Sequence, residues 1–393
     1  MTQRLYYTDS YLRDFEAIVV ERAEEGRRIY LDRTAFYPTS GGQPFDTGQL
    51  GGIRVTDVVD EGERVAHLLA EPLLEERAVG QVDWTRRFDH MQQHTGQHVL
   101  SAILADTLGY TTVGVHFGRD TSTLDLDAGT LPADQVIQAE QRANEVVAEN
   151  LPVEVTFEEA ETAIGLRKGS ARTGTLRVVN IRNLDRSACG GTHVRATGEI
   201  GAILIRKAER VRKGIRLEFL CGARAIRQAR ADYSLISRLA GELSAAPDEL
   251  PRLIDALRTD VKDGASLRRE LEARLDLYRA RELYGAASPD PTGIRRVLLR
   301  QETGSLDQFR GVAQAVASMR SAIFVGVVAS PPAVLLAAST DAGVDAAGVL
   351  KGLLGAVGGR GGGSTSLAQG VLPGPAQLEQ VLLSLGVGQE SRV

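Results

Sequence analysis

The sequence predicts an α+β multidomain fold with four parts: a small N-terminal β-barrel, an α+β core, a helical hairpin and a C-terminal α/β domain. The chain has 393 residues, which is too long for one ordinary core. Short strand patterns fill its start, a long helical pattern carrying several histidines follows, and strand and helix patterns alternate at its end. We place the domain boundaries at 1–83, 84–225, 226–287 and 288–393.

The composition is that of a soluble globular protein, with 43% hydrophobic and 25% charged residues. The start of the chain is polar and carries acids, so we expect no signal peptide. No apolar run of about 18 residues occurs, so we expect no membrane span. Two cysteines do not make a disulfide framework, and the cytoplasm is the expected location.

The net charge of −5 conceals a basic stretch. From Gly165 to Arg230 there are 16 Lys and Arg but only 4 Asp and Glu. A basic stretch inside an acidic protein predicts a polyanionic partner, with nucleic acid as the first candidate. The alternative is a solvated surface of mixed sign.

The first 83 residues contain short strand patterns separated by Gly, Pro and acidic turns, which favour a small barrel or sandwich. The expected strands cover 15–20, 27–32, 53–59, 64–69 and 78–84. Between the second and third lies a loop rich in glycine and hydroxyl groups, residues 36–44. Such a loop lets a ligand or another backbone approach closely, and the alternative is a plain barrel turn.

A continuous helical pattern covers 88–108 and ends at Gly109. His90, His94 and His98 recur on it every four residues, which places them on one face. Three histidines in that arrangement favour a metal site over solitary core histidines, and His90 is the weakest because nothing else pairs with it.

The rest of the core mixes strands and helices. We expect a hairpin over 111–127 that carries His116, helices over 132–150 and 158–166, and strands over 151–157, 176–181, 200–206 and 215–220.

Beyond the core, 225–287 is helical with a break near Pro247 and Pro251, which predicts a helical hairpin. The end of the chain alternates strands and helices. Its glycine-rich segment, 358–363, cannot pack through side chains, so its backbone must approach something closely. A phosphate-binding loop and a flexible linker are the two alternatives.

Cys189-Gly190-Gly191-Thr192-His193 adds a thiol and an imidazole on a glycine turn. With His94 and His98 it supplies three His and one Cys, enough for a tetrahedral zinc shell. The Glu of a zinc-peptidase HExxH motif and the PCxxC of a cytidine deaminase are both missing from the sequence. Four protein ligands are typical of a structural site, while the wide separation of the two pairs favours a catalytic one. Sequence alone leaves both open.

Several motifs together resemble the editing domain of alanyl-tRNA synthetases and the free-standing AlaX editing proteins. FYPTSGGQPFDTG (36–48) is similar to the glycine-rich motif of that family, and HTGQHVLS (94–101) stands where the family often has HTATHLL. RVVNIRNLDRSACGGTHVRATGEIG (177–201) and KGIRLEFLCG (213–222) resemble the second half of the editing core. GGRGGGSTSLAQG (358–370) is similar to the glycine-rich end of the synthetase's C-terminal domain.

The resemblance implies a Zn²⁺-dependent hydrolase that cleaves the ester joining Ser or Gly to tRNA(Ala), acting in trans because the aminoacylation domain does not precede the barrel. The implied ligands are His94, His98, Cys189 and His193. The implied pocket residues are Thr95, which contacts the substrate hydroxyl, Gln97, a polar group between the ligands, His116, and the bordering Gly41, Gly42 and Gln43.

The basic stretch would then face the acceptor stem of the tRNA. The expected phosphate contacts are Arg206, Lys207, Arg210, Arg212, Lys213 and Arg216. The helical and C-terminal regions would add reach or a homodimer interface. The rival interpretations are a tRNA-binding protein with a structural zinc and no turnover, and a nucleotide phosphodiesterase, for which the sequence lacks an Asp-His-His motif.

Overall fold

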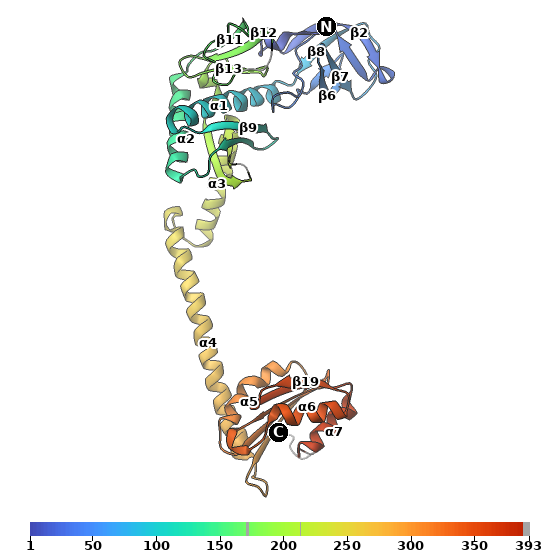
Figure 1. Ribbon diagram of the computed structural model, residues 1–393, viewed down its shortest axis with the longest axis vertical. Helices are drawn as coiled ribbons and strands as arrows, with labels where there is room; N and C mark the ends of the chain where they lie inside the picture. Colours follow the sequence, from blue (N-terminus) through green and yellow to red (C-terminus); the bar gives the residue numbers. More distant parts are fainter. Residues whose placement is uncertain (170–172, 213, 388–393) are drawn as a thin grey trace. The chain divides into compact units, whose positions relative to one another are not determined.

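The fold is taken from a computed structural model that describes residues 1–169, 173–212 and 214–387. It divides into two compact units, Met1–Glu242 and Leu243–Val393 (Figure 1). Several sheets and seven α-helices occur among the described residues, which confirms the mixed α and β multidomain class. The finer boundaries at 83, 225 and 287 stay predictions. Within the described part of the chain, none of the helices is both long and apolar enough to span a bilayer.

The first unit begins with six strands that close on themselves in the order β2-β3-β7-β6-β5-β8. Alternating side chains point inward and form one core around Phe36, Leu50 and Val65. A short parallel pair lies beside this ring. The strands are β1 (Gln3–Arg4), β2 (Asp14–Ala23), β3 (Arg28–Leu31), β4 (Arg33–Thr34), β5 (Gly48–Leu50), β6 (Ile53–Glu61), β7 (Arg64–Leu69) and β8 (Arg77–Val82).

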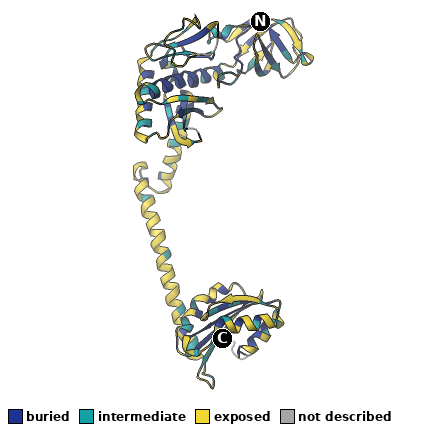
Figure 2. Ribbon diagram, in the orientation of Figure 1, coloured by how far each residue is buried: buried dark blue, intermediate teal, exposed yellow. Residues whose placement is uncertain are grey.

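Helix α1 (Trp84–Leu108) is the centre of the first unit. The side chain of Asp83 caps it by accepting a hydrogen bond from the Arg86 amide, so it begins one turn earlier than the sequence pattern predicts. Gly109, at φ +74°, ends it as expected. Residues 87 and 90–104 of α1 are buried, as the dark blue helix in Figure 2 shows.

Two small antiparallel sheets and a second helix surround α1. One sheet has the order β14-β15-β10-β9 and the other β11-β12-β13. The elements are β9 (Thr111–Phe117), β10 (Ser122–Asp127), α2 (Ala133–Glu149), β11 (Val153–Glu159), β12 (Thr175–Ile181), β13 (Asp185–Ala188), β14 (Ile203–Val211), β15 (Gly214–Cys221) and α3 (Ala223–Glu242).

The prediction of a helix over 158–166 is wrong. Strand β11 continues to Glu159 because every residue from Val153 onward pairs with β12, ending at Glu159 opposite Thr175. The described residues that follow Glu159 form turns and bends. Cross-strand pairing therefore overrides the weak helical pattern of this segment.

The second unit begins with α4 (Leu250–Ala286) and continues into a five-stranded sheet of order β16-β17-β18-β20-β19. Helices α6 and α7 pack on one face of the sheet, and α5 with the end of α4 packs on the other. The elements are β16 (Arg295–Thr303), α5 (Arg310–Ala317), β17 (Ala322–Ser330), β18 (Ala333–Ala338), α6 (Ala346–Ala356), β19 (Arg360–Gly363), β20 (Leu367–Val371) and α7 (Pro375–Ser384).

The glycine-rich segment is neither a phosphate loop nor a linker. It forms the edge strand β19, which pairs with β20. A Cβ on Gly361 would lie 2.4 Å from the Gln369 carbonyl oxygen and 2.5 Å from Leu354 of α6. The close approach expected for this backbone is therefore to β20 and α6.

Candidate metal centre

Four side chains that are ordinary metal ligands meet in the first unit. One potential ligand atom each from His94, His98, Cys189 and His193 lies within 4.8 Å of all the others. The first two residues come from the middle of α1, and the last two come from the loop after β13. The segments that the sequence predicted to meet do so here, and the donor set is one that binds metals. We call these four residues the cluster.

Helix geometry places His94 and His98 together. Their spacing puts them one turn apart on one face, and their ring centroids lie 5.3 Å apart. Both side chains are almost completely buried. The ring of Phe117 packs against His94 with a centroid distance of 5.0 Å, so β9 covers one flank of the pair.

The glycine turn brings the other two residues to the helix. Cys189 Sγ lies 3.4 Å from His94 Nε2 and 3.3 Å from His193 Nε2. A Cβ on Gly191 would lie 2.1 Å from Cε1 of His94, so only glycine fits between the loop and the ring. Arg177 holds the loop from behind, since Nη1 donates to the Cys189 carbonyl at 2.7 Å.

Each imidazole of the cluster is held by an oxygen at Nδ1. His94 Nδ1 lies 2.8 Å from Gln43 Oε1, His98 Nδ1 lies 2.8 Å from Asp185 Oδ2, and His193 Nδ1 lies 3.2 Å from Thr95 Oγ1. Nε2 of each ring is thus left for the cluster. Oxygen partners at the outer nitrogen are usual around histidine metal ligands.

The electrostatics favour the ligating forms of two of the residues. Burial opposes a thiolate at Cys189, but His94 and His193 outweigh it and hold its pKa well below the ordinary value. Burial, helped by His94, lowers the pKa of His193 to about 3, which keeps this imidazole neutral. A thiolate and a neutral imidazole are the forms that bind metal.

His98 behaves differently. Burial disfavours the protonated, charged form of this imidazole. Hydrogen bonds to Asp185 and Cys189 outweigh burial and raise the pKa of the imidazole to about 10. A metal ion at the cluster must therefore displace this proton. With that exception, the donor types, the Nδ1 partners and the burial all fit a bound metal ion.

His90, the remaining histidine on the buried face of α1, is outside the cluster. It lies one turn before His94 and is itself buried. Among the described residues, the side chains that could together hold a metal ion do not include His90.

Of the three expected catalytic residues, only Thr95 contacts a cluster residue. Its hydroxyl donates to the Met91 carbonyl and accepts from the Val194 amide and His193 Nδ1, so its hydrogen-bonding capacity is used. It therefore has no bond left for a substrate. Gln97 donates to Ser101 Oγ at 2.8 Å instead of to a cluster residue. His116 is exposed on the face of β9 opposite to Phe117, and its place in the pocket stays a prediction.

The glycine-rich loop of the first strands reaches the cluster through Gln43. This side chain is fully buried. Its Oε1 accepts from the Thr192 amide as well as from His94, and its Nε2 donates to Thr192 Oγ1 at 2.9 Å. Gly42 accepts from the Phe117 amide and would place a Cβ 2.9 Å from the Val115 carbonyl oxygen. Gly41, at φ +56°, has open space around it.

Sequence reasoning missed two further residues at the cluster, Asp185 and Arg177. Arg167 bonds the second oxygen of Asp185 and so fixes the carboxylate behind His98. The nearest signal in the sequence is the position of Asp185 four residues before Cys189.

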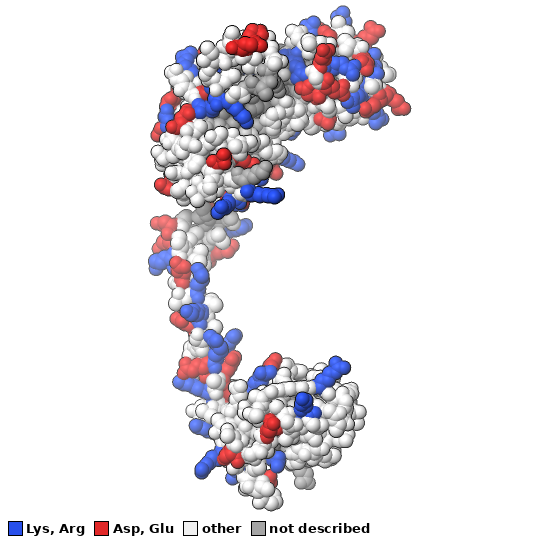
Figure 3. All heavy atoms as spheres, in the orientation of Figure 1, with Lys and Arg blue, Asp and Glu red and all other residues white. Residues whose placement is uncertain are grey.

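Some of the basic residues expected to contact phosphates already form ion pairs with acidic side chains, and others do not. Arg216 forms a bidentate pair with Asp125, Lys207 pairs with Glu209, and Arg206 lies 3.8 Å from Asp232. Within the described ranges, Arg210 and Arg212 have no acidic partner. Lys213 lies outside the described residues. On the face drawn in Figure 3, basic and acidic side chains are interspersed.

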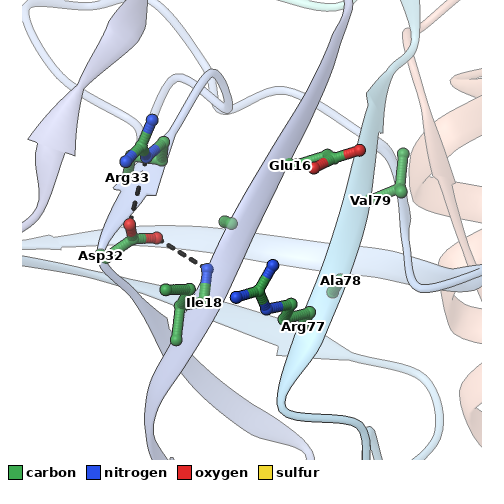
Figure 4. Close-up of a pocket in the computed structure, with 8 residues that line it drawn as sticks. Glu16, Ile18, Asp32, Arg33, Arg77, Ala78 and Val79 are labelled. Carbon is green, nitrogen blue, oxygen red and sulfur yellow. Dashed lines mark hydrogen bonds and ion pairs between the residues drawn. The ribbon is translucent and has the colours of Figure 1, made fainter.

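A hollow of about 360 Å³ on the barrel is separate from the cluster (Figure 4). Its walls come from β2, β8, Asp32 and the first residue of β4, and Asp32 bonds the Ile18 amide and the Arg33 side chain there. None of the cluster residues lines it.

The chain is similar to an alanyl-tRNA editing protein and to alanine–tRNA ligases. Residues 176–217 match the model of the threonyl and alanyl tRNA synthetase second additional domain. The alanyl-tRNA editing protein AlaX-L of Pyrococcus horikoshii is 31% identical over 94% of this chain and 94% of its own length. The alanine–tRNA ligase of Methanoregula boonei is 32% identical over 99% of this chain.

This chain spans only 43% of the length of that ligase. Among solved structures, the C-Ala domain of Aquifex aeolicus alanyl-tRNA synthetase matches 23% of this chain and 87% of that chain at 18% identity. The TM-score of this match is 0.22.

Proposed function

The chain belongs to the family of alanyl-tRNA editing proteins, and we propose that it hydrolyses the ester of mischarged tRNA(Ala) in trans. The observation that carries this proposal is the cluster, a His₃Cys donor set whose three imidazoles are buried and held at Nδ1. The match to AlaX-L over nearly its whole length supports action on tRNA that another enzyme has charged.

We propose Zn²⁺ as the ion that His94, His98, Cys189 and His193 hold. A set of three imidazoles and one thiolate suits zinc better than the hard cations, which prefer oxygen ligands. When bound, zinc supplies Lewis acidity next to the ester bond.

The protein's own residues position this centre. Gln43, Thr95 and Asp185 each fix the orientation of one imidazole, and Arg177 fixes the loop that carries Cys189. The three histidines of the cluster are buried and Cys189 is partly buried, which limits the access of bulk water and strengthens any interaction with developing charge.

We propose that Gln97 distinguishes between the amino acids that the ester can carry. Its Nε2 is engaged with Ser101, while Oε1 has no hydrogen-bond partner among the residues that the structure describes. That oxygen can accept a hydrogen bond from the hydroxyl of a seryl ester, which an alanyl ester lacks. A site that pairs with a substrate hydroxyl discriminates strongly against an analogue without it.

The test is deacylation of tRNA(Ala) charged separately with Ser, Gly and Ala. We expect release of Ser or Gly while Ala is spared, and reduced discrimination between Ser and Ala in Gln97→Leu. Tight tRNA binding with no release of any amino acid would replace the proposal with a tRNA-binding protein that carries a structural zinc.

A further inference from the structure

A cavity lies in the first unit, at the amino end of α1. Its volume is about 450 Å³, which is in the range of small-ligand sites. The first two turns of α1, the first turn of α3 and Arg119 of the turn between β9 and β10 form its walls. No cluster residue lines it, and nothing proposed above uses it.

The charged groups of the cavity leave an excess of positive charge. Asp89 is neutralised by Arg224, whose Nε and Nη2 both bond the carboxylate while Nη1 donates to the Gly118 carbonyl. Arg119 and Arg227 are exposed and have no partner among the described residues. The remaining acid, Asp83, is occupied as the cap of α1. Two free guanidinium groups at one cavity suit a phosphate.

The apolar wall of the same cavity is aromatic. Trp84 and Phe88 line it with ring centroids 5.5 Å apart, and both are partly exposed. The guanidinium of Arg13 lies 4.0 Å from the centroid of the Trp84 ring and supports it. Cationic groups beside aromatic rings are the combination by which proteins bind single-stranded nucleic acid.

His90 supplies an independent sign of a ligand. This residue lines the cavity and is 3% exposed. Its Nδ1 is buried and has no hydrogen-bond partner among the described residues. Buried polar atoms are nearly always paired, so an unpaired one at a cavity wall points to a group that binds there.

We propose that this cavity binds one nucleotide of a single-stranded RNA end, with its phosphate between Arg119 and Arg227 and its base against Trp84 and Phe88. The proposal rests on the proposed function, since that RNA is the end of the tRNA. His90 precedes His94 by one helical turn, about 6 Å along α1. A strand whose last nucleotide lies at the cluster would thus place a preceding nucleotide at the cavity.

Trp84 makes the test direct, because it is the only tryptophan in the sequence. The full-length protein is titrated with an RNA trinucleotide ending in adenosine, with AMP and with inorganic phosphate, while tryptophan fluorescence is recorded. We expect the trinucleotide to change the fluorescence and to bind more tightly than AMP or phosphate. Arg119→Ala and Arg227→Ala should each weaken its binding about tenfold.

Arg27→Ala is the matched control. Arg27 is an exposed arginine of the barrel and does not line the cavity, so its loss should leave trinucleotide binding unchanged. Unchanged melting temperatures show that the cavity variants are folded.

Three results would overturn the proposal: no fluorescence change with the trinucleotide, equal binding of AMP or phosphate, or an equal effect of Arg27→Ala. Deacylation by the same samples separates the two proposals. Deacylation without a fluorescence change removes the cavity proposal and keeps the editing function. A fluorescence change that the arginine variants weaken, without deacylation, keeps the cavity as an RNA site and removes the editing function.

Discussion

Three side chains, Gln43, Thr95 and Asp185, each hold one imidazole of the cluster through Nδ1. They come from three different elements, the loop before β5, helix α1 and strand β13. Their common effect is to fix the tautomer that leaves Nε2 for a metal ion. Thr95 is thus a positioning residue, since its hydroxyl has no bond left for a substrate.

Thr95→Val removes this hydroxyl while keeping the shape of the side chain. We expect the zinc affinity to fall about 10- to 100-fold, because His193 loses the acceptor that orients it. Competition with a colorimetric chelator measures this. Thr95→Ser keeps the hydroxyl and should restore most of the affinity. Equal affinities for the valine variant and the wild-type protein would contradict the role of Thr95.

The cluster ligands could be predicted from the sequence because their spacing carries geometric information. Two histidines four apart share a helix face, and Gly190 and Gly191 permit a sharp turn between Cys189 and His193. The partners of the imidazoles could not be predicted in the same way. Gln43 lies 51 residues before His94 in the chain, and nothing local indicates that its loop folds against α1.

Strand β7 contains a histidine whose ionisation is linked to the stability of the barrel. His67 is fully buried, with Nδ1 against the Ile29 carbonyl and Nε2 against Thr34 Oγ1. Burial lowers its pKa from 6.5 to about 4. The unfolded chain therefore takes up a proton between these pH values that the folded barrel does not.

We expect this difference to reduce stability as the pH falls from about 6.5 to about 4, by roughly 3 kcal/mol in total. Urea unfolding of the wild-type protein and of His67→Gln at several pH values measures it. The variant lacks the titrating group, so its free energy of unfolding should fall less over this window. Parallel pH profiles for the two proteins would refute the linkage.

The hairpin β14–β15 carries the basic residues proposed to contact the tRNA. Arg210 and Arg212 have no acidic partner within the described part of the chain, whereas Arg216 is already paired with Asp125. Phosphate contacts formed by unpaired arginines require no ion pair to break. We therefore assign the greater share of tRNA binding to Arg210 and Arg212.

The double variant Arg210→Ala/Arg212→Ala should weaken tRNA binding and reduce the salt dependence of log K by about two. Arg216→Ala serves as the comparison and should have a smaller effect. Binding isotherms at several salt concentrations give both quantities. If the double variant keeps the salt dependence of the wild-type protein, the hairpin does not contact the phosphates.

At the scale of single elements, helices and strands could be predicted where the sequence pattern was long. They were misjudged where pairing with another strand determines the structure. The periodicity of α1 and the alternation in β9 and β10 identified those elements correctly. The end of β11 read as a helix because its pairing with β12 is invisible in the local sequence. Strand β19, made largely of glycine, has no strand propensity and is defined by its partners β20 and α6.

At the scale of the whole chain, two units have separate cores. The cores around α1 and inside the barrel belong to Met1–Glu242, and the two faces of the five-stranded sheet are buried within Leu243–Val393. The cluster lies entirely in the first unit. Metal binding should therefore stabilise the first unit and leave the stability of the second unchanged.

Differential scanning calorimetry should resolve two unfolding transitions in the full-length protein. A zinc chelator should lower the temperature of one transition and leave the other in place, because only the unit with the cluster binds the ion. A single transition, or a shift of both by the chelator, would contradict independent stability of the two units.

The central claim is that the ion held by the cluster is the catalytic centre of a tRNA deacylase. Its most direct test measures bound zinc and the rate of seryl ester hydrolysis in the same samples, from fully loaded protein to protein stripped by chelation. Cys189→Ala and Cys221→Ala are included, the second as a control because Cys221 is a buried cysteine outside the cluster. We predict that the rate falls in proportion to zinc, that Cys189→Ala loses both, and that Cys221→Ala keeps both. A rate that stays constant while zinc is removed would contradict the claim.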